Sequence, residues 1–234
     1  MPDNLVWGRA LVAAMHALPP ECTAVALVRH AEREPIPSFQ ENDVAALTPR
    51  GEADAYQLGR HLPAGRPIRL FHSPIGRCQM TAVRIAEGFR SVGGSAEVLG
   101  CAPLFGGPYV VDAEEICHLL AGMGDHFVRA WFDGEIPSTA ILPPQDAARQ
   151  QWHAMRGVAR EAPAGSLTLV CTHDWNIMLV RETYLGVRHE EQGWAEFLDG
   201  PVLVLHNGEC RLTWRDRTTA MPLFAPASDR AHTA

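Results

Sequence analysis

The sequence predicts an α/β fold, a three-layer α/β/α sandwich with a mostly parallel central sheet and a helical and loop cap insertion. Short apolar runs rich in Val and Leu have the length of buried strands and lie at about 23–29, 68–72 and 167–171. Segments with apolar residues at helical spacing separate these runs and lie at 49–62, 76–90 and 145–161. The run 167–171 shows no polar alternation, which is typical of a strand covered on both faces, as in parallel sheets.

The first half of the chain alternates regularly. An amphipathic N-terminal helix carries apolar residues at Leu5, Leu11, Val12, Met15 and Leu18. The first strand, a loop from Arg33 to Ala46, the helix 49–62 and the second strand follow. Ser73 is expected to cap the helix that starts near Gly76, with Pro74 in its first turn. A third strand is expected near 96–100.

The alternation breaks between about 102 and 150. This segment contains Gly and Pro pairs and two short helical pieces, 112–120 and 125–133, so we interpret it as an insertion above the strand ends. Its aromatic residues either line a pocket or belong to the core. A helix 175–186 follows the strand 167–171. The chain then predicts a terminal hairpin of strands 201–206 and 210–214, because Asn207-Gly208 favours a type I′ turn.

Titratable side chains follow three of the predicted strands at the points where the strands end. They are Arg29, His30 and Arg33 after the first strand, Arg77 after the second, and His173 with Asp174 after the run 167–171. Each group alone is typical of a solvated charge or a structural histidine. Because ligands bind beyond the carboxyl ends of strands in open α/β sheets, the three groups together predict an anion site.

Three short motifs add to this pattern. They are Arg29-His30-Ala31-Glu32, Leu47-Thr48-x-x-Gly51, and Ser73 with Arg77 and Thr81. With these motifs the chain resembles the histidine phosphatase superfamily, which includes cofactor-dependent phosphoglycerate mutases and histidine acid phosphatases. Ala31 stands where the family usually has glycine. The resemblance covers roughly residues 23–206 and implies one domain, residues 1–234, with the cap insertion at about 102–150.

The resemblance implies a role for each charged group, and elementary chemistry agrees with it. Arginine forks bind phosphate oxygens in pairs and stay charged, and a neutral imidazole is a competent nucleophile. His30 is therefore expected to carry the phosphoryl group. The groups expected around the phosphate are Arg29, Arg33, Arg77 and His173. Surrounding positive charge should keep His30 neutral.

The leaving group also needs a proton donor. The family's mutase-like branch uses a Glu in a segment that here reads Pro103-Leu104-Phe105 and has no acid. The acid phosphatase-like branch uses the Asp of a His-Asp pair, which His173-Asp174 matches, so this resemblance is the closer one. Asp174 is the expected general acid. Glu32, Asp112 and Glu114 remain lesser candidates, because a cap loop can bring an acid over the site.

The expected function is a phosphatase that hydrolyses a phosphomonoester through a phosphohistidine on His30. One alternative is a phosphoglycerate mutase-like phosphotransferase, which would need a bisphosphorylated activator. A second alternative, from another class, is a non-catalytic phospholigand-binding protein on the same fold. The partner in each case is a small phosphorylated molecule, and the sequence does not name it.

Composition is typical of a globular protein. The chain has 234 residues, 47% hydrophobic residues and a net charge of −7, which argues against nucleic acid as partner. Its six cysteines and its histidines are dispersed, so neither a metal site nor a cofactor is expected. No stretch is long and apolar enough to cross a membrane, and the cytoplasm is the default location. Loop spacing gives no indication of oligomeric state.

Overall fold

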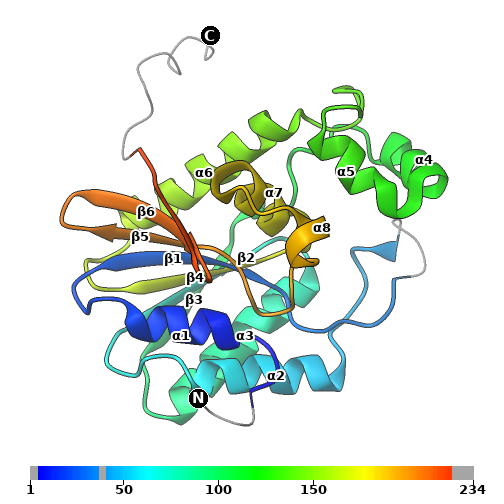
Figure 1. Ribbon diagram of the computed structural model, residues 1–234. Helices are drawn as coiled ribbons and strands as arrows, with labels where there is room; N and C mark the ends of the chain where they lie inside the picture. The colour runs from blue at the N-terminus through cyan, green and yellow to red at the C-terminus, as the bar shows by residue number, and fades with distance from the viewer. Residues whose placement is uncertain (1–4, 37–40, 223–234) are drawn as a thin grey trace.

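The computed structural model describes residues 5–36 and 41–222. Its centre is a seven-stranded sheet with the order β3-β2-β4-β1-β5-β6-β7. The strands are β1 (Thr23–Arg29), β2 (Ile68–His72), β3 (Ala96–Cys101), β4 (Leu167–Thr172), β5 (Val202–His206), β6 (Glu209–Trp214) and β7 (Arg217–Ala220). Figure 1 shows helices on both faces of this sheet, which confirms the predicted α/β sandwich.

Two groups of helices form the outer layers. One face carries α1 (Arg9–Ala17), α2 (Pro49–Arg60) and α3 (Gly76–Ser91), and the other carries α6 (Pro144–Glu161) and α7 (Asp174–Leu185). Residues of β1 alternate between the two layers, as the two-residue period of a strand requires. Val25 and Leu27 pack in the cluster that includes Met155 of α6, whereas Ala26 packs in the cluster that includes Leu58 of α2.

The sheet is mixed, so the expectation of a mostly parallel sheet was wrong in its second half. The neighbours β3, β2, β4 and β1 run parallel, but each pairing from β1 through β5 and β6 to β7 is antiparallel. Short turns can join only antiparallel strands. The predicted hairpin turn is present, with φ of 49° at Asn207 and 77° at Gly208. Strand β7, which follows a second tight turn, was not predicted.

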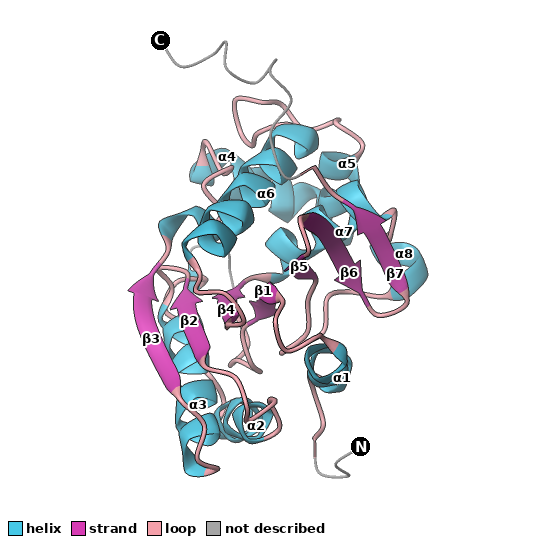
Figure 2. Cartoon of the chain, turned by 90° about the vertical axis from the view of Figure 1, so that its left-hand side faces the viewer, coloured by secondary structure: helices cyan, strands magenta, loops and turns pink. Residues whose placement is uncertain are grey.

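The segment between β3 and α6 is helical, as predicted. It contains the 3-10 helices η2 (Pro103–Phe105) and η3 (Gly124–His126) and the helices α4 (Ala113–Met123) and α5 (Phe127–Phe132). Figure 2 shows α4 and α5 at the end of the molecule opposite to α2 and α3. Tyr109, Phe127 and Trp131 are at most 2% exposed. Of the two interpretations of these aromatic residues, the structure therefore supports the core.

A short helix, α8 (His189–Gln192), lies between α7 and β5 and was also not predicted. Within residues 5–36 and 41–222, none of the helices combines the length and the apolar character that crossing a bilayer requires.

Candidate active site

The order of the strands brings the predicted groups together. β1, β4 and β2 are neighbours and run parallel, with Arg29 opposite Thr172 and His72 opposite Cys171. The residues that follow these strands therefore leave the sheet side by side. The backbone N–H of His30 donates to Thr172 O at 2.9 Å, and the rings of His30 and His173 lie 5.6 Å apart. Two histidines 143 positions apart in the sequence thus share one site.

The hydrogen bonds of His30 define its tautomer. Nδ1 lies 2.8 Å from the carbonyl oxygen of Ala31, and because a carbonyl only accepts, Nδ1 carries the proton. Nε2 of the neutral ring then keeps its lone pair. The imidazole is only 2% exposed. Burial lowers its pKa well below the usual range, and the charges of Arg77 and Arg29 lower it further. His30 is therefore neutral, as predicted.

The segment after His30 is held by two of the recognised motifs. The N–H of Ala31 donates to Oγ1 of Thr81 at 3.0 Å. Thr48 accepts the N–H of Gly51 at 2.9 Å and starts α2 against the backbone of Glu32. A Cβ on Gly51 would lie 2.1 Å from Glu32 O, so only glycine allows this approach. Ala31 itself is buried and its φ is not positive, so alanine fits where the family usually has glycine.

His173 is fixed by Arg77 and Ser73. Nη2 of Arg77 donates to Nδ1 of His173 at 3.1 Å. Nε2 of the neutral ring therefore carries the proton and donates to Oγ of Ser73 at 2.9 Å. The expectation that Ser73 caps the helix was wrong, because α3 begins at Gly76 without a side-chain cap. Burial first, then the charge of Arg77, lowers the pKa of His173 to about 4.

Asp174 forms an ion pair with Arg29. Oδ2 of Asp174 lies 3.0 Å from Nη2 of Arg29 and also accepts the indole N–H of Trp194 at 2.8 Å. Oδ1 accepts the backbone N–H of Trp175 at 3.0 Å. Burial raises the pKa of Asp174, but Arg29 and then Trp194 outweigh burial and hold that pKa at about 2. The carboxyl group is therefore ionised in the free protein.

Arg29 is also held by Ala195 and Phe197, on the connection between α8 and β5. Its Nη1 donates to Ala195 O at 2.6 Å, and its guanidinium carbon lies 4.2 Å from the ring centre of Phe197. Leu198 adopts a left-handed φ of 57° and returns its N–H to Arg29 O. No pattern in the sequence marks Ala195 or Phe197.

Arg77 has a further partner on the loop before α2. Its Nη1 donates to the backbone oxygen of Asn42, and its Nη2 donates to Oδ1 of the same residue at 2.9 Å. Asn42 was not among the predicted site residues, because nothing in its sequence neighbourhood distinguishes it from an ordinary loop asparagine. The contact joins this loop to the cluster around His173.

The remaining predicted residues do not contact the two imidazoles. Among the described residues, Arg33 donates to Glu34 O. Burial is the main cause of the lowered pKa of Arg29 and of Arg77, and the charge of Arg33 lowers both further. Glu32 accepts the hydroxyl of Thr48 at 2.9 Å. Asp112 caps α4 through the N–H groups of Glu114 and Glu115, and both Asp112 and Glu114 are exposed. The structure thus brings together Arg29, His30, Arg77, His173 and Asp174.

Known proteins share sequence features and the fold of this chain. Residues 25–98 match the histidine phosphatase superfamily (branch 1). Solved structures with the same fold include a mycobacterial glucosyl-3-phosphoglycerate phosphatase, which is 16% identical with a TM-score of 0.56 over 83% of this chain and 99% of its own. A phosphoserine phosphatase from Entamoeba histolytica, in complex with 3-phosphoglyceric acid, is 17% identical with a TM-score of 0.57 over 86% of this chain and 100% of its own. A phosphoglycerate mutase from Bacillus anthracis is 13% identical with a TM-score of 0.51 over 80% of this chain and 90% of its own.

The chain shares its fold with these phosphatases and the mutase, and its match to the histidine phosphatase superfamily covers residues 25–98. A comparison with curated protein sequences gave no match. The matched residues end before His173 and Asp174, and the description specifies branch 1. Neither finding therefore supports the closer resemblance to the acid phosphatase-like branch.

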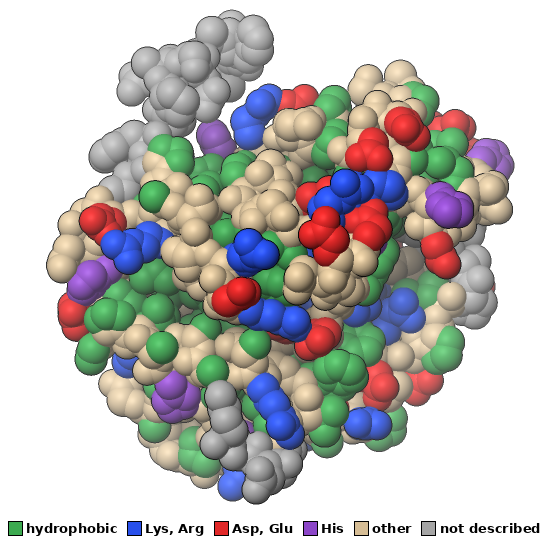
Figure 3. All heavy atoms as spheres, in the orientation of Figure 1, with side chains coloured by type: hydrophobic (Ala, Val, Ile, Leu, Met, Phe, Trp, Pro, Cys, Tyr) green, Lys and Arg blue, Asp and Glu red, His purple; other side chains and the backbone are tan. Residues whose placement is uncertain are grey.

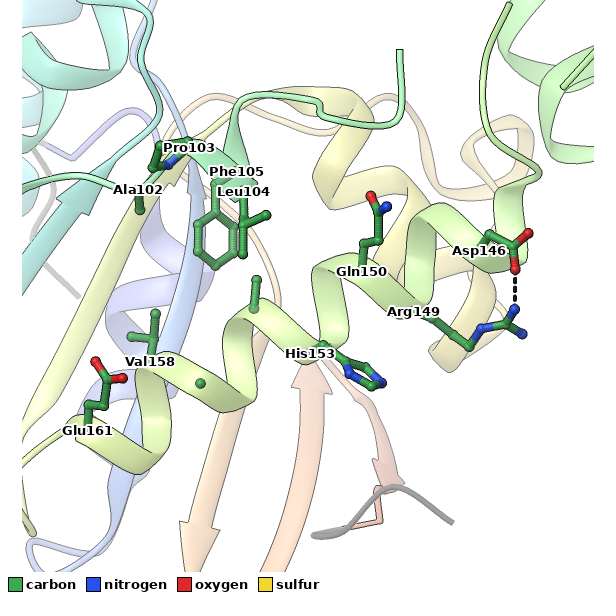
Figure 4. A pocket seen from close by; sticks show the side chains of 12 residues that line it. Ala102, Pro103, Leu104, Phe105, Asp146, Arg149, Gln150, His153, Val158 and Glu161 are labelled. Atoms are coloured by element: carbon green, nitrogen blue, oxygen red, sulfur yellow. Dashed lines mark hydrogen bonds and ion pairs between the residues drawn. The ribbon is translucent and has the colours of Figure 1, made fainter. Parts of the chain in front are cut away.

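Two other features lie outside this site. A groove of about 730 Å³ runs along α6 next to η2, lined by Leu104, Val158 and others (Figure 4). Acidic and basic side chains also gather over α5 and α8 (Figure 3). There Glu182, His189 and Glu190 have the spacing of metal ligands, but Arg129 pairs with both glutamates and supplies the positive charge.

Proposed function

We propose that this protein is a phosphatase that hydrolyses a small phosphomonoester through a phosphohistidine on His30. Arg29, Arg77 and His173 bind the phosphoryl group, and Arg33 adds positive charge. Asp174 is the general acid. The observation that carries the proposal is the lone pair on Nε2 of His30, which accepts no hydrogen bond from residues 5–36 and 41–222, in a neutral ring next to two guanidinium groups. Fixed cations of this kind stabilise the charge of a phosphoryl group in transfer.

The reaction has two steps in this site. In the first, Nε2 of His30 attacks phosphorus, the bond to the ester oxygen breaks, and Asp174 gives that oxygen a proton. In the second, Asp174 as carboxylate takes a proton from water, whose oxygen attacks phosphorus and breaks the P–N bond. Inorganic phosphate and neutral His30 result, so the enzyme returns to its starting state.

Substrate binding must first give Asp174 its proton. In the free protein Arg29 and Trp194 keep the carboxyl group ionised. A phosphate that takes N–H groups of Arg29 weakens this ion pair and places negative charge beside Asp174. Both changes raise the pKa of Asp174. Proton uptake by the acid is therefore coupled to binding of the phosphorylated substrate.

Hydrolysis rather than phosphoryl return is favoured by the residues near η2. Phe105 is buried, and its carbonyl oxygen accepts hydrogen bonds from Thr172 and Asn176. Neither Leu104 nor Phe105 supplies the acid that the mutase-like branch uses at this place. We also propose that residues 102–150 form the cap of a single domain and decide which leaving group enters.

The decisive experiment is capture of the covalent intermediate. Acid quenching during turnover of a ³²P-labelled phosphomonoester should trap acid-labile label on the wild-type protein and none on His30→Ala. His72→Asn is the matched control, because His72 ends the neighbouring strand and makes the same Nδ1 contact, to Ser73 O at 2.8 Å. Label that persists in His30→Ala would remove His30 from the nucleophile role.

Product analysis separates the alternatives. A phosphatase releases free phosphate from 3-phosphoglycerate or another ester, whereas a mutase returns an isomerised ester. A protein that binds phosphate but neither takes up label nor turns over would be a phospholigand-binding protein.

A further inference from the structure

Asn42 presents two oxygen atoms to the phosphate-binding arginine. Its backbone oxygen accepts from Nη1 of Arg77, and its Oδ1 accepts from Nη2 at 2.9 Å. A carboxylate or phosphate binds an arginine in the same bidentate manner. The amide orientation is defined by its second contact, because Nδ2 of Asn42 donates to Oδ1 of Asp43 at 3.1 Å. The oxygen, not the nitrogen, therefore faces Arg77.

The other donors of Arg77 offer no second bidentate face. Nη2 also donates to Nδ1 of His173. Nε is buried and has no hydrogen-bond partner within residues 5–36 and 41–222. A phosphate that needs both terminal nitrogens of Arg77 must therefore replace Asn42.

Burial explains why the free protein needs such a contact. The Arg77 side chain is only 4% exposed, and a buried cation without acceptors is costly. Asn42 supplies two acceptors without adding a negative charge. A phosphate dianion forms stronger, charge-assisted hydrogen bonds than a neutral amide, so it can displace Asn42.

We infer that Asn42 is an internal substitute for the substrate phosphate, which occupies Arg77 in the free protein and is displaced when a phosphorylated ligand binds. Asn42 is thus an affinity-setting residue. The inference rests on the proposed phosphate-binding role of Arg77. The loop is suited to such a movement, because Asp43 and Val44 beside Asn42 are exposed, Val44 by 79%.

The test is calorimetric titration of purified variants with inorganic phosphate, which requires no turnover. Asn42→Ala removes the competing side-chain oxygen and should tighten phosphate binding about 5-fold. Asn42→Asp replaces a neutral competitor by a charged one and should weaken binding by at least about tenfold. Val44→Thr, on the same loop, is the control and should bind as the wild type does. Asn42→Ser replaces Asn42→Ala if the latter does not fold.

Kinetics on p-nitrophenyl phosphate give a second measurement. Asn42→Ala should lower KM while kcat changes less than about twofold, whereas general damage to the loop would lower kcat. Weaker phosphate binding by both Asn42→Ala and Asn42→Asp would overturn the inference and leave Asn42 as a residue that only orients Arg77. Wild-type protein that does not bind phosphate would also overturn it. If Asn42→Ala binds phosphate more tightly and Asn42→Asp more weakly than the wild type, but the wild type turns over no phosphomonoester, only the phosphatase proposal is refuted.

Discussion

The indole nitrogen of Trp194 donates a hydrogen bond of 2.8 Å to Oδ2 of Asp174. The same oxygen pairs with Arg29 at 3.0 Å, so two donors converge on one atom of the proposed acid. Trp194 is 41% exposed and forms part of the rim of the site. The protonation state of Asp174 therefore depends on a residue that is accessible from solvent and is simple to replace.

Trp194→Phe should shift the basic limb of the kcat profile to higher pH. The substitution keeps an aromatic ring but removes the N–H that stabilises the carboxylate, so the pKa of Asp174 rises. Because the acid must be protonated in the enzyme–substrate complex, activity should persist to a pH higher by about half a unit to one unit. The measurement is kcat against pH on an alkyl phosphate.

Trp7→Phe is the control for this prediction. It also removes an indole N–H, but that group has no hydrogen-bond partner in the described part of the chain. The basic limb should stay in place in this variant. A Trp194→Phe limb that stayed in place or moved to lower pH would contradict the link between Trp194 and the acid.

Asp174→Asn should affect substrates according to their leaving groups. An alkoxide needs a proton as it departs, whereas p-nitrophenolate does not. The loss in kcat/KM should reach about 10² to 10⁴ for an alkyl phosphate and be much smaller for p-nitrophenyl phosphate. Asparagine retains an oxygen that can accept from Arg29, so the arginine stays in place. Equal losses on the two substrates would assign Asp174 to orientation of Arg29 instead.

The free energy of unfolding should fall as the pH is lowered from 7 towards 4. His173 has a pKa of about 4 in the folded protein and about 6.5 when exposed, and burial is the main cause. Between these values the unfolded chain binds a proton that the folded site excludes, so stability rises with pH in this window. His30 acts in the same direction. The stabilisation is complete above pH 6.5 and is lost on the way down to pH 4.

The size of this effect follows from the shift. For His173 alone, the difference between its pKa in the folded and in the unfolded protein corresponds to a loss on the order of 3 kcal/mol in the free energy of unfolding at the acid end of the window. Urea unfolding at a series of pH values measures it. His173→Asn should flatten the pH dependence of stability, while replacement of the exposed His153 by Gln should not. A wild-type protein equally stable at pH 7 and pH 5 would show that these imidazoles take up protons without unfolding.

The sequence predicted every strand of the sheet except β7, most helices and the five clustered residues, because these depend on local patterns and on one topological fact. Apolar runs define β1, β2 and β4, and parallel neighbours place the residues after their carboxyl ends together. In the antiparallel half the hairpin of β5 and β6 was predicted, but β7 was missed because it is a strand of only four residues with little apolar content. Strand pairing there follows from the hairpin turn at Asn207 and from the turn at Arg215 that precedes β7.

The partners of the site residues were harder to predict because they come from distant segments. Ala195 and Asn42 contact Arg29 and Arg77 partly through backbone oxygens, which any residue type provides. Serine is a residue type that often caps helices, which is why Ser73 was expected to do so. Only the three-dimensional position of His173 shows that Ser73 binds the imidazole instead. Side-chain identity therefore indicated the charged groups but not the groups that hold them.

Gly51→Ala should destabilise the protein and impair the site together. The new Cβ would lie 2.1 Å from Glu32 O, a backbone atom two residues after His30, so either α2 or the segment carrying the nucleophile must move. We expect a loss of about 2–4 kcal/mol in the free energy of unfolding and a lower kcat. Gly157→Ala is the matched control, because Gly157 lies in the last third of α6 and its Cβ would meet no atom within 4 Å. That substitution should stabilise the protein by about 0.5–1 kcal/mol. Chemical denaturation of the two variants beside the wild type decides the matter, and equal stability of both variants would show that α2 does not position the segment after His30.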